Sequence, residues 1–186
     1  MPHAELLAPQ RTERSPRAMP AVDALVCAIE AACAGDARRM PAQIVAALEE
    51  AAAQADLLTS DQRVAQAGCY ARHVLHSDPG GRFTVVAIVW AAGQFSPIHG
   101  HQTWCAYAVH ENTLEETIYA WDAASGTARP VRATMRPPGY GCFAVAGLDQ
   151  IHRLGNSGTR PAISIHVYGV EGEHVATHVN RVVRTA

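Results

Sequence analysis

The feature of this sequence that most constrains its fold is a change of pattern near residue 68. From there on, short stretches rich in β-branched and aromatic residues recur about every ten residues, separated by glycine and proline. Regular short strands with such turns are typical of an antiparallel sandwich or barrel. The expected strands span residues 70–75, 82–90, 98–103, 105–110, 115–121, 129–135, 142–146, 151–154, 162–168 and 174–183. The sequence therefore predicts a mainly β fold.

Ahead of this change, the chain is rich in alanine, leucine and glutamate, and its apolar residues follow a helical period. One helix is expected over residues 21–34. A second is expected over residues 41–55, because Pro41 is tolerated in a first helical turn. A third short helix is expected over residues 60–67, capped by Ser60. These segments predict an N-terminal helical layer that packs on the strands.

The length of the chain favours a single domain. The sequence has 186 residues, of which 48% are hydrophobic, and this suits one packed core. The polar segment 1–20 is expected to form a flexible N-terminal tail. Residues 21–186 are expected to form one domain, with 21–67 as the helical layer and 68–186 as the β-barrel.

The composition argues against several functions. The net charge is −2 and only 17% of residues are charged, so no broad positive surface for nucleic acid is expected. No apolar run reaches the roughly 18 residues that a membrane helix needs, and no export signal is recognisable. The five cysteines form no CxxC pair, which excludes a zinc ribbon and is typical of reduced thiols. We expect a cytoplasmic protein that binds neither nucleic acid nor a membrane.

Three histidines are candidates for a metal site. His99 and His101 are two residues apart in an expected strand, so their side chains share one face. His152 lies in another expected strand, and three imidazoles from two strands would leave coordination positions open. An HxH pair alone is a weak signal, because many such pairs lie on protein surfaces.

The surrounding spacing strengthens the metal interpretation. Gly93, His99 and His101 match the first half of a cupin motif, and His152 with Asn156 matches the end of the second. Cupins are jelly-roll barrels that hold a metal between these strands. Where cupins commonly place a glutamate ligand, this chain has Cys105, which leaves three neutral imidazoles. Ligand type alone allows iron or zinc. A zinc or nickel isomerase, another dioxygenase, and a non-enzymatic, non-redox metal-binding cupin all remain open.

Several further motifs, all in register, resemble one family within the cupin superfamily. They are Tyr70-Ala-Arg72-His-Val-Leu, Gly81-Arg-Phe83, Val89-Trp90-Ala-Ala-Gly93, Pro97-Ile-His99-Gly-His101, Leu114-Glu-Glu-Thr117, His152-Arg-Leu-Gly-Asn156 and Ser164-Ile-His166-Val-Tyr168. Together they span roughly residues 60–170 and resemble the thiol dioxygenases, cysteine dioxygenase type I most closely. The resemblance implies a cupin-type antiparallel jelly-roll barrel with an N-terminal α-helical layer.

The resemblance also implies a chemistry. It predicts one Fe(II) per chain, O₂ as co-substrate, and oxidation of a small thiol carboxylate to a sulfinic acid, with L-cysteine as the expected substrate. By position, the iron ligands would be His99, His101 and His152. The residues matching the family's hydrogen-bonded relay are Ser164, His166 and Tyr168.

Substrate binding is expected at Arg72, which matches the family position that holds the substrate carboxylate, with help from Tyr70 two residues earlier. Without the resemblance, Arg72 would be read as a surface arginine and the relay as a polar stripe. Cys105 matches the position of a thioether crosslink to Tyr168, if one residue is deleted after His101. A buried free thiol is the alternative for Cys105.

Some features depart from the cysteine-oxidising pattern. Gly100 replaces an aspartate that is often found between the two ligands, and Trp104 is nearer to the mercaptopropionate group. Oxidation of 3-mercaptopropionate or mercaptosuccinate therefore remains an alternative. Either a monomer or a homodimer is compatible with the sequence.

Overall fold

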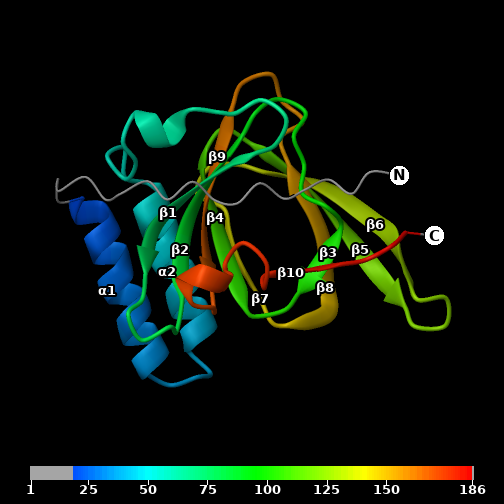
Figure 1. The fold of residues 1–186 in the computed structure, drawn as a ribbon, viewed down its shortest axis with the longest axis horizontal. Coiled ribbons are helices and arrows are strands. Elements are labelled where there is room, and N and C mark those ends of the chain that lie inside the picture. Colours follow the sequence, from blue (N-terminus) through cyan, green and yellow to red (C-terminus); the bar gives the residue numbers. More distant parts are fainter. Residues whose placement is uncertain (1–18, 186) are drawn as a thin grey trace.

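The computed structural model describes residues 19–185, so nearly all of the expected N-terminal tail lies outside the described residues (Figure 1). Two helices, α1 (Pro20–Ala34) and α2 (Met40–Ala52), precede the strands. Sheet I contains, in spatial order, β1 (Ala71–Ser77), β2 (Thr84–Trp90), β9 (Ala162–Tyr168), β4 (Cys105–Glu111) and β7 (Gly141–Ala144). Sheet II contains β10 (Asn180–Val182), β3 (His99–His101), β8 (Gly147–Gly155), β5 (Leu114–Asp122) and β6 (Thr127–Arg136).

The order of the strands is that of a jelly roll. Every strand pair in the two sheets is antiparallel. From β2 onward the chain passes repeatedly from one sheet to the other, and the two sheets face each other across a shared interior (Figure 1). This topology confirms the expected mainly β, cupin-type antiparallel jelly-roll barrel with an N-terminal helical layer.

The central strands of sheet I, β2, β9 and β4, are buried on both faces because the helices cover the outer side of the sheet (Figure 1). Successive residues of a strand point to opposite faces. In β2, Val85, Ala87 and Val89 therefore pack in one cluster with the helices. The alternate residues Val86, Ile88 and Trp90 belong to a second cluster inside the barrel. This double burial explains why β2 is the longest apolar stretch of the sequence.

The helices form close to where they were expected. Each has a proline in its first two positions, where the missing N–H costs nothing. Their buried stripes, which include Ile29, Ile44 and Leu48, pack on sheet I. The second helix ends at Ala52, three residues earlier than predicted.

Two expected elements are wrong. In place of a helix over 60–67 there is a single 3₁₀ turn, Asp61–Arg63, and Ser60 makes no capping bond. Thr59 and Gln62 hold that turn instead, because each backbone N–H donates to the other's side chain (3.0 and 3.4 Å). The strand expected over 174–183 shrinks to β10.

The reason for the second error lies in residue spacing. Val175 and Val179 are both buried but stand four apart, which suits a coiled turn rather than strand alternation. The backbone N–H of His178 donates to the carbonyl of His174 (2.8 Å), which closes such a turn.

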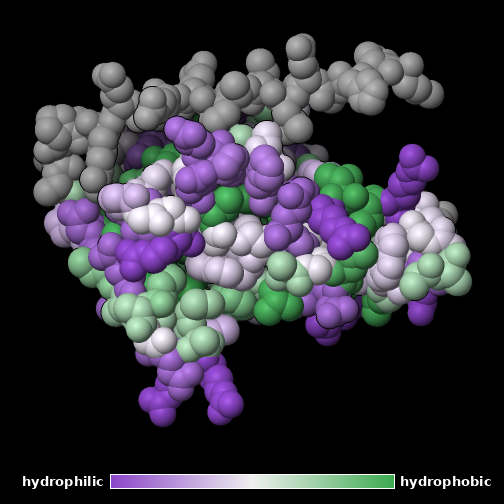
Figure 2. Space-filling model, turned by 60° about the horizontal axis from the view of Figure 1, so that its bottom comes forward, coloured by the Kyte–Doolittle hydropathy of each residue, from purple (hydrophilic) through white to green (hydrophobic). Residues whose placement is uncertain are grey.

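Within residues 19–185, neither helix is long and apolar enough to cross a membrane. On the face shown in Figure 2, hydrophobic residues form green patches separated by hydrophilic and intermediate ones.

Candidate metal centre and adjoining cavity

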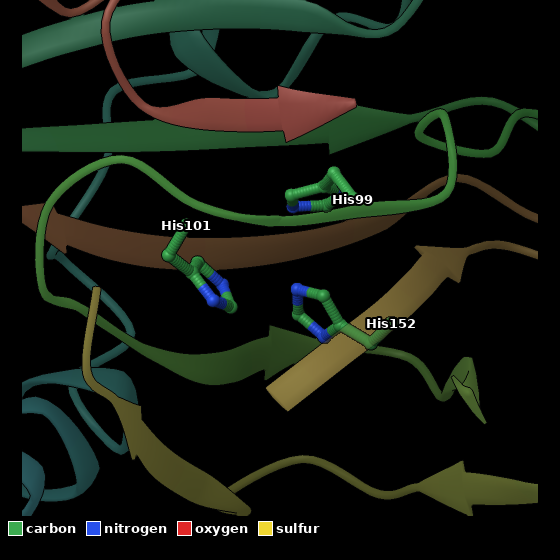
Figure 3. Close-up of side chains that lie close together, drawn as sticks. All are labelled: His99, His101 and His152. Carbon is green, nitrogen blue, oxygen red and sulfur yellow. The ribbon is translucent and has the colours of Figure 1, made fainter. Parts of the chain in front are cut away.

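Three buried histidines of sheet II point toward one another inside the barrel (Figure 3). His99 and His101 come from β3, and His152 on β8 is the register partner of His99. One ligand nitrogen from each ring lies within 4.8 Å of the other two. The structure therefore brings together the three residues that the sequence singled out for metal binding.

Gly100 lies between the two histidines of β3, at a point where β3 and β8 approach each other too closely for a side chain. A Cβ atom at this position would collide with the carbonyl oxygen of Gly147 on β8. No side chain fits there, which explains why this chain lacks the aspartate that the resemblance led us to expect.

Hydrogen bonds fix the proton of two of these rings. Nδ1 of His99 lies 2.8 Å from the carbonyl oxygen of Pro97, which only accepts, so Nδ1 carries the proton and Nε2 is free. Nδ1 of His152 likewise donates to a carboxylate oxygen of Glu116 at 2.7 Å. Neither ring nitrogen of His101 has a hydrogen-bond partner among residues 19–185. Unpaired buried nitrogens of this kind are what a metal ion would satisfy.

The electrostatics keep the rings of His99 and His101 neutral. Burial, followed by the effect of the neighbouring His152, lowers the pKa of His99 to about 3. Burial, followed by the effect of His152, also lowers the pKa of His101 to about 4. Metal binding requires the unprotonated imidazole, so both rings are ready to bind at neutral pH. The donor set fits a divalent metal such as iron or zinc.

Glu116 is a functional residue that sequence reasoning missed. It is buried on β5, and its second oxygen accepts two hydrogen bonds from Arg136, from Nε at 2.8 Å and Nη2 at 2.6 Å. Burial alone would raise the pKa of Glu116, but the bonds to His152 and Arg136 outweigh it and lower the pKa. Glu116 is thus an ionised carboxylate that orients a metal ligand. The available signal was a charged residue at an inward position, two residues after the fully buried Leu114.

Facing the histidines, β9 of sheet I carries a chain of hydrogen bonds. Oγ of Ser164 lies 2.8 Å from Nε2 of His166, and Nδ1 of His166 lies 3.2 Å from the hydroxyl of Tyr168. The indole N–H of Trp90 donates to Oγ of Ser164 at 2.9 Å, a contact that the sequence did not predict. These β9 residues alternate with Ile163, Ile165 and Val167, which pack toward the helices.

Burial keeps this chain uncharged. It lowers the pKa of His166 well below its ordinary value, and the positive charge of Arg72 adds to the effect. It raises the pKa of Tyr168 above its ordinary value. At neutral pH, Tyr168 is therefore a hydroxyl that can donate a hydrogen bond, and His166 is a neutral imidazole.

A cavity of ≈ 360 Å³, including open solvent, joins the two walls. The expected site residues that line it are Tyr70, Arg72, His99, Cys105, His152, His166 and Tyr168. Arg72 is the one cationic side chain in this lining apart from any protonated histidine. Its Nη2 donates to the hydroxyl of Tyr70 at 3.1 Å, which limits the positions the guanidinium can take. Such a group can grip a carboxylate through paired hydrogen bonds.

The sequence profile of the family described as "Cysteine dioxygenase type I" matches residues 25–176. The chain belongs to the cysteine dioxygenase type I family. A cysteine dioxygenase type 1 from Danio rerio is 28% identical over 107 residues, which cover 53% of this chain and 50% of that protein. The human protein of the same name is 28% identical over 90 residues, covering 47% and 45%. This member of the family thus spans about half the length of the curated relatives it matches.

Among solved structures, similar folds include a double-stranded β-helix protein from Klebsiella pneumoniae, with a TM-score of 0.48 and 21% identity. The match covers 62% of this chain and 84% of that one. A recombinant oxalate oxidase matches with a TM-score of 0.45 and 17% identity, over 61% of this chain and 59% of that one.

In this cysteine dioxygenase family member, Cys105 on β4 is the direct register partner of Tyr168 on β9. Directly opposed residues of an antiparallel pair have neighbouring side chains on one face, and both are buried. Burial raises the pKa of the Cys105 thiol, so it stays protonated. The expected crosslink between the two remains a prediction that this pairing permits.

Proposed function

We propose that this chain is a thiol dioxygenase that uses Fe(II) and O₂ to convert L-cysteine into cysteine sulfinic acid. The observation that carries the proposal is the lining of one cavity, in which Arg72 faces the ligand histidines His99 and His152. A metal-binding end and a carboxylate-binding end in one space suit a small molecule with a thiol at one end and an acid at the other. Membership of the cysteine dioxygenase type I family supports the same reaction.

His99, His101 and His152 would hold the iron. When bound, ferrous iron supplies the activation of O₂ that allows both oxygen atoms to be added to a thiolate sulfur. Glu116 would keep His152 in the tautomer and orientation that ligation needs. Together these residues would keep three imidazole nitrogens close to one point.

Arg72 would bind the substrate carboxylate, and Tyr70 would keep the guanidinium in place through its hydroxyl. Fixing one end of a short molecule also fixes the position of its sulfur, which supplies orientation before the reaction. On the opposite side, the Tyr168 hydroxyl would donate a hydrogen bond to the reacting group, while His166 and Ser164 set the direction of that hydroxyl.

The cavity favours a substrate with a single carboxylate. Its lining has one guanidinium and no aspartate or glutamate, so it offers no second cation for a dicarboxylate and no anion for a charged amine. We therefore expect L-cysteine to bind with a neutral amine. The monocarboxylate 3-mercaptopropionate is the second candidate, and mercaptosuccinate is disfavoured by its additional charge.

The proposal is tested by measuring O₂ uptake of the iron-loaded protein with L-cysteine, 3-mercaptopropionate and mercaptosuccinate in parallel. We expect the highest kcat/KM for L-cysteine and one O₂ consumed per sulfinate formed. Zinc-loaded protein serves as the control and should be inactive. Absence of O₂ uptake with all three thiols, at full iron occupancy, contradicts the proposal.

The crosslink has a separate test. If Cys105 and Tyr168 join, the protein loses two hydrogen atoms, and tryptic digestion yields one linked peptide pair in place of two separate peptides. Cys105→Ser should abolish that species. Two unlinked peptides after repeated turnover would show that Cys105 remains a free thiol.

A further inference from the structure

A second, larger cavity reaches the same histidines from another part of the barrel. It has ≈ 710 Å³ of empty volume, including open solvent, and lies between β4 and β7 of sheet I and β5, β6 and β8 of sheet II. His101, His152 and Glu116 form part of its wall, but Arg72, Tyr70 and His166 do not. The proposed oxidation leaves this space without a role.

Two hydrogen-bond donors in the lining could bind a ligand. The guanidinium of Arg132 on β6 makes no ion pair or side-chain hydrogen bond within residues 19–185. Arg132 is an exposed residue of the lining, and its register partner Ile118 on β5 also lines the cavity. Tyr107 is buried, and its hydroxyl is paired only with the sulfur of Cys142, its register partner on β7, in the described part of the chain. Sulfur is a weak hydrogen-bond acceptor, so a ligand oxygen in the cavity would be a stronger partner for this hydroxyl.

Most other charged side chains of the lining are already paired within the protein. Arg136 is bound to Glu116 through two N–H groups, and its guanidinium lies 4.1 Å from the centre of the Tyr140 ring. Glu116 in turn has its other oxygen on His152, so this carboxylate is shared between two donors. The remaining acid, Asp149, is exposed to solvent. What the cavity offers a ligand is therefore an unpaired guanidinium and a phenol O–H.

Part of the remaining wall is apolar. Ile118, Phe143 and Ala144 line the same space and would contact a short hydrocarbon group. An anion with two acceptor oxygens on a small carbon chain matches both parts of the lining. We propose that this second cavity binds a small organic acid, either a carboxylate or a sulfinate, with Arg132 as its anchor and Tyr107 as a second donor. The site shares Cys105, Tyr107 and His152 with the cavity that contains Arg72, but it has its own cationic anchor in Arg132 and does not depend on the proposed oxidation.

The test must separate this site from Arg72, which can also hold a carboxylate. Arg72→Gln is therefore the parent protein, loaded with Fe(II) without oxygen and titrated by calorimetry with propionate, ethanesulfinate and inorganic phosphate. We expect one organic acid to bind the parent, and Arg72→Gln/Arg132→Gln to raise its Kd about tenfold or more, because a charge-assisted pair is lost. Arg72→Gln/Arg129→Gln is the matched control, since Arg129 is an exposed arginine of the same strand outside the cavity.

Each outcome decides the proposal. Tighter binding of ethanesulfinate identifies a sulfinate site, and tighter binding of propionate identifies a carboxylate site. If neither acid binds the parent, if Arg132→Gln changes nothing, or if phosphate binds as tightly as both, the organic acid site is overturned. Loss of thiol oxidation in Arg72→Gln bears only on the proposed function, because the titration does not involve turnover.

Discussion

The two sheets divide the work of the candidate site. Sheet II supplies the three histidines and Glu116, which holds one of them in place. Sheet I supplies Arg72 and the hydrogen-bonded residues of β9. Sheet I is backed by helices, so its central strands β2, β9 and β4 are buried on both faces, whereas much of β6 at the edge of sheet II is exposed. The residues proposed to bind the metal and those proposed to orient the substrate therefore lie on separate walls, and mutations should be able to separate the two roles.

The largest effect is expected from loss of a ligand on sheet II. His101→Ala should abolish iron binding and O₂ uptake, since two imidazoles hold a divalent metal poorly. Metal content by elemental analysis and O₂ uptake should fall together. His178→Ala, a substitution of an exposed histidine, is the control and should change neither. Activity retained in iron-free His101→Ala would break the assignment of sheet II.

A smaller loss, of a different kind, is expected on sheet I. Arg72→Gln should lower kcat/KM by about 100-fold, mainly through KM, because a charged carboxylate contact is worth roughly 1.5–3 kcal/mol. Iron content should stay at the wild-type level. Arg72→Lys should lie between the two, since it keeps the charge but not the paired geometry. If Arg72→Gln loses iron, the two walls are not independent.

Mutation of Glu116 tests the role of sheet II in metal binding without removing a ligand. Glu116→Ala should weaken iron binding by about 10–100-fold, the usual cost of removing a carboxylate behind a ligating histidine. Glu116→Gln should cost less, because an amide oxygen still accepts the hydrogen bond from His152. Competition with a chelator measures the affinity. Glu115→Ala, at the neighbouring outward position of β5, is the matched control and should bind iron normally.

The last prediction concerns the stability of the iron-free protein, rather than its activity, and involves both walls. Burial lowers the pKa of His99 to about 3 and of His101 to about 4, and it also lowers that of His166 on sheet I. The unfolded chain takes up protons near the ordinary histidine pKa, at about 6.5, whereas the folded protein does not. Below that pH the unfolded state binds more protons, so stability falls as the pH is lowered toward 4.

Urea unfolding between pH 7 and pH 4.5 measures this effect. Each histidine should contribute up to about a tenfold change per pH unit in the unfolding equilibrium constant. His99→Asn and His166→Asn should each flatten the curve, and the exposed His178→Asn should not. A curve that is level across this range would show that the three rings gain protons in the folded state.

How far the sequence determines the fold is clearest in two strands. The strand over 162–168 has the predicted bounds, because its alternating residues are fixed by two separate cores. The segment 174–183 was mispredicted because its β-branched residues suit either a strand or a turn. Its real course depends on Val175 and Val179 reaching the barrel interior. The local sequence pattern predicts a strand correctly where its alternating residues are buried on both faces. It fails where packing against distant strands determines the conformation of the segment.

The candidate site shows the same limit. The spacing of His99 and His101 within one strand was visible in the sequence, and the family motifs added His152. The role of Glu116 was not visible in the sequence, because it depends on β5 lying beside β8, and this pairing places the carboxylate of Glu116 against His152. The Trp90–Ser164 bond also joins residues of neighbouring strands, β2 and β9. Partners across a sheet follow from register, which no local pattern reveals.

The double burial of β9 restricts how this protein can change in length. Moving this strand by one residue would turn Ser164 and its polar neighbours toward the helices and bring Ile163 and Ile165 into the cavity. Gain or loss of a residue inside such a strand would thus replace the polar side chains of the cavity wall with apolar ones. The one-residue deletion inferred after His101 avoids this penalty, since it falls in the short link before β4 rather than within a strand. Insertions and deletions are therefore tolerated in the links between strands rather than within the strands.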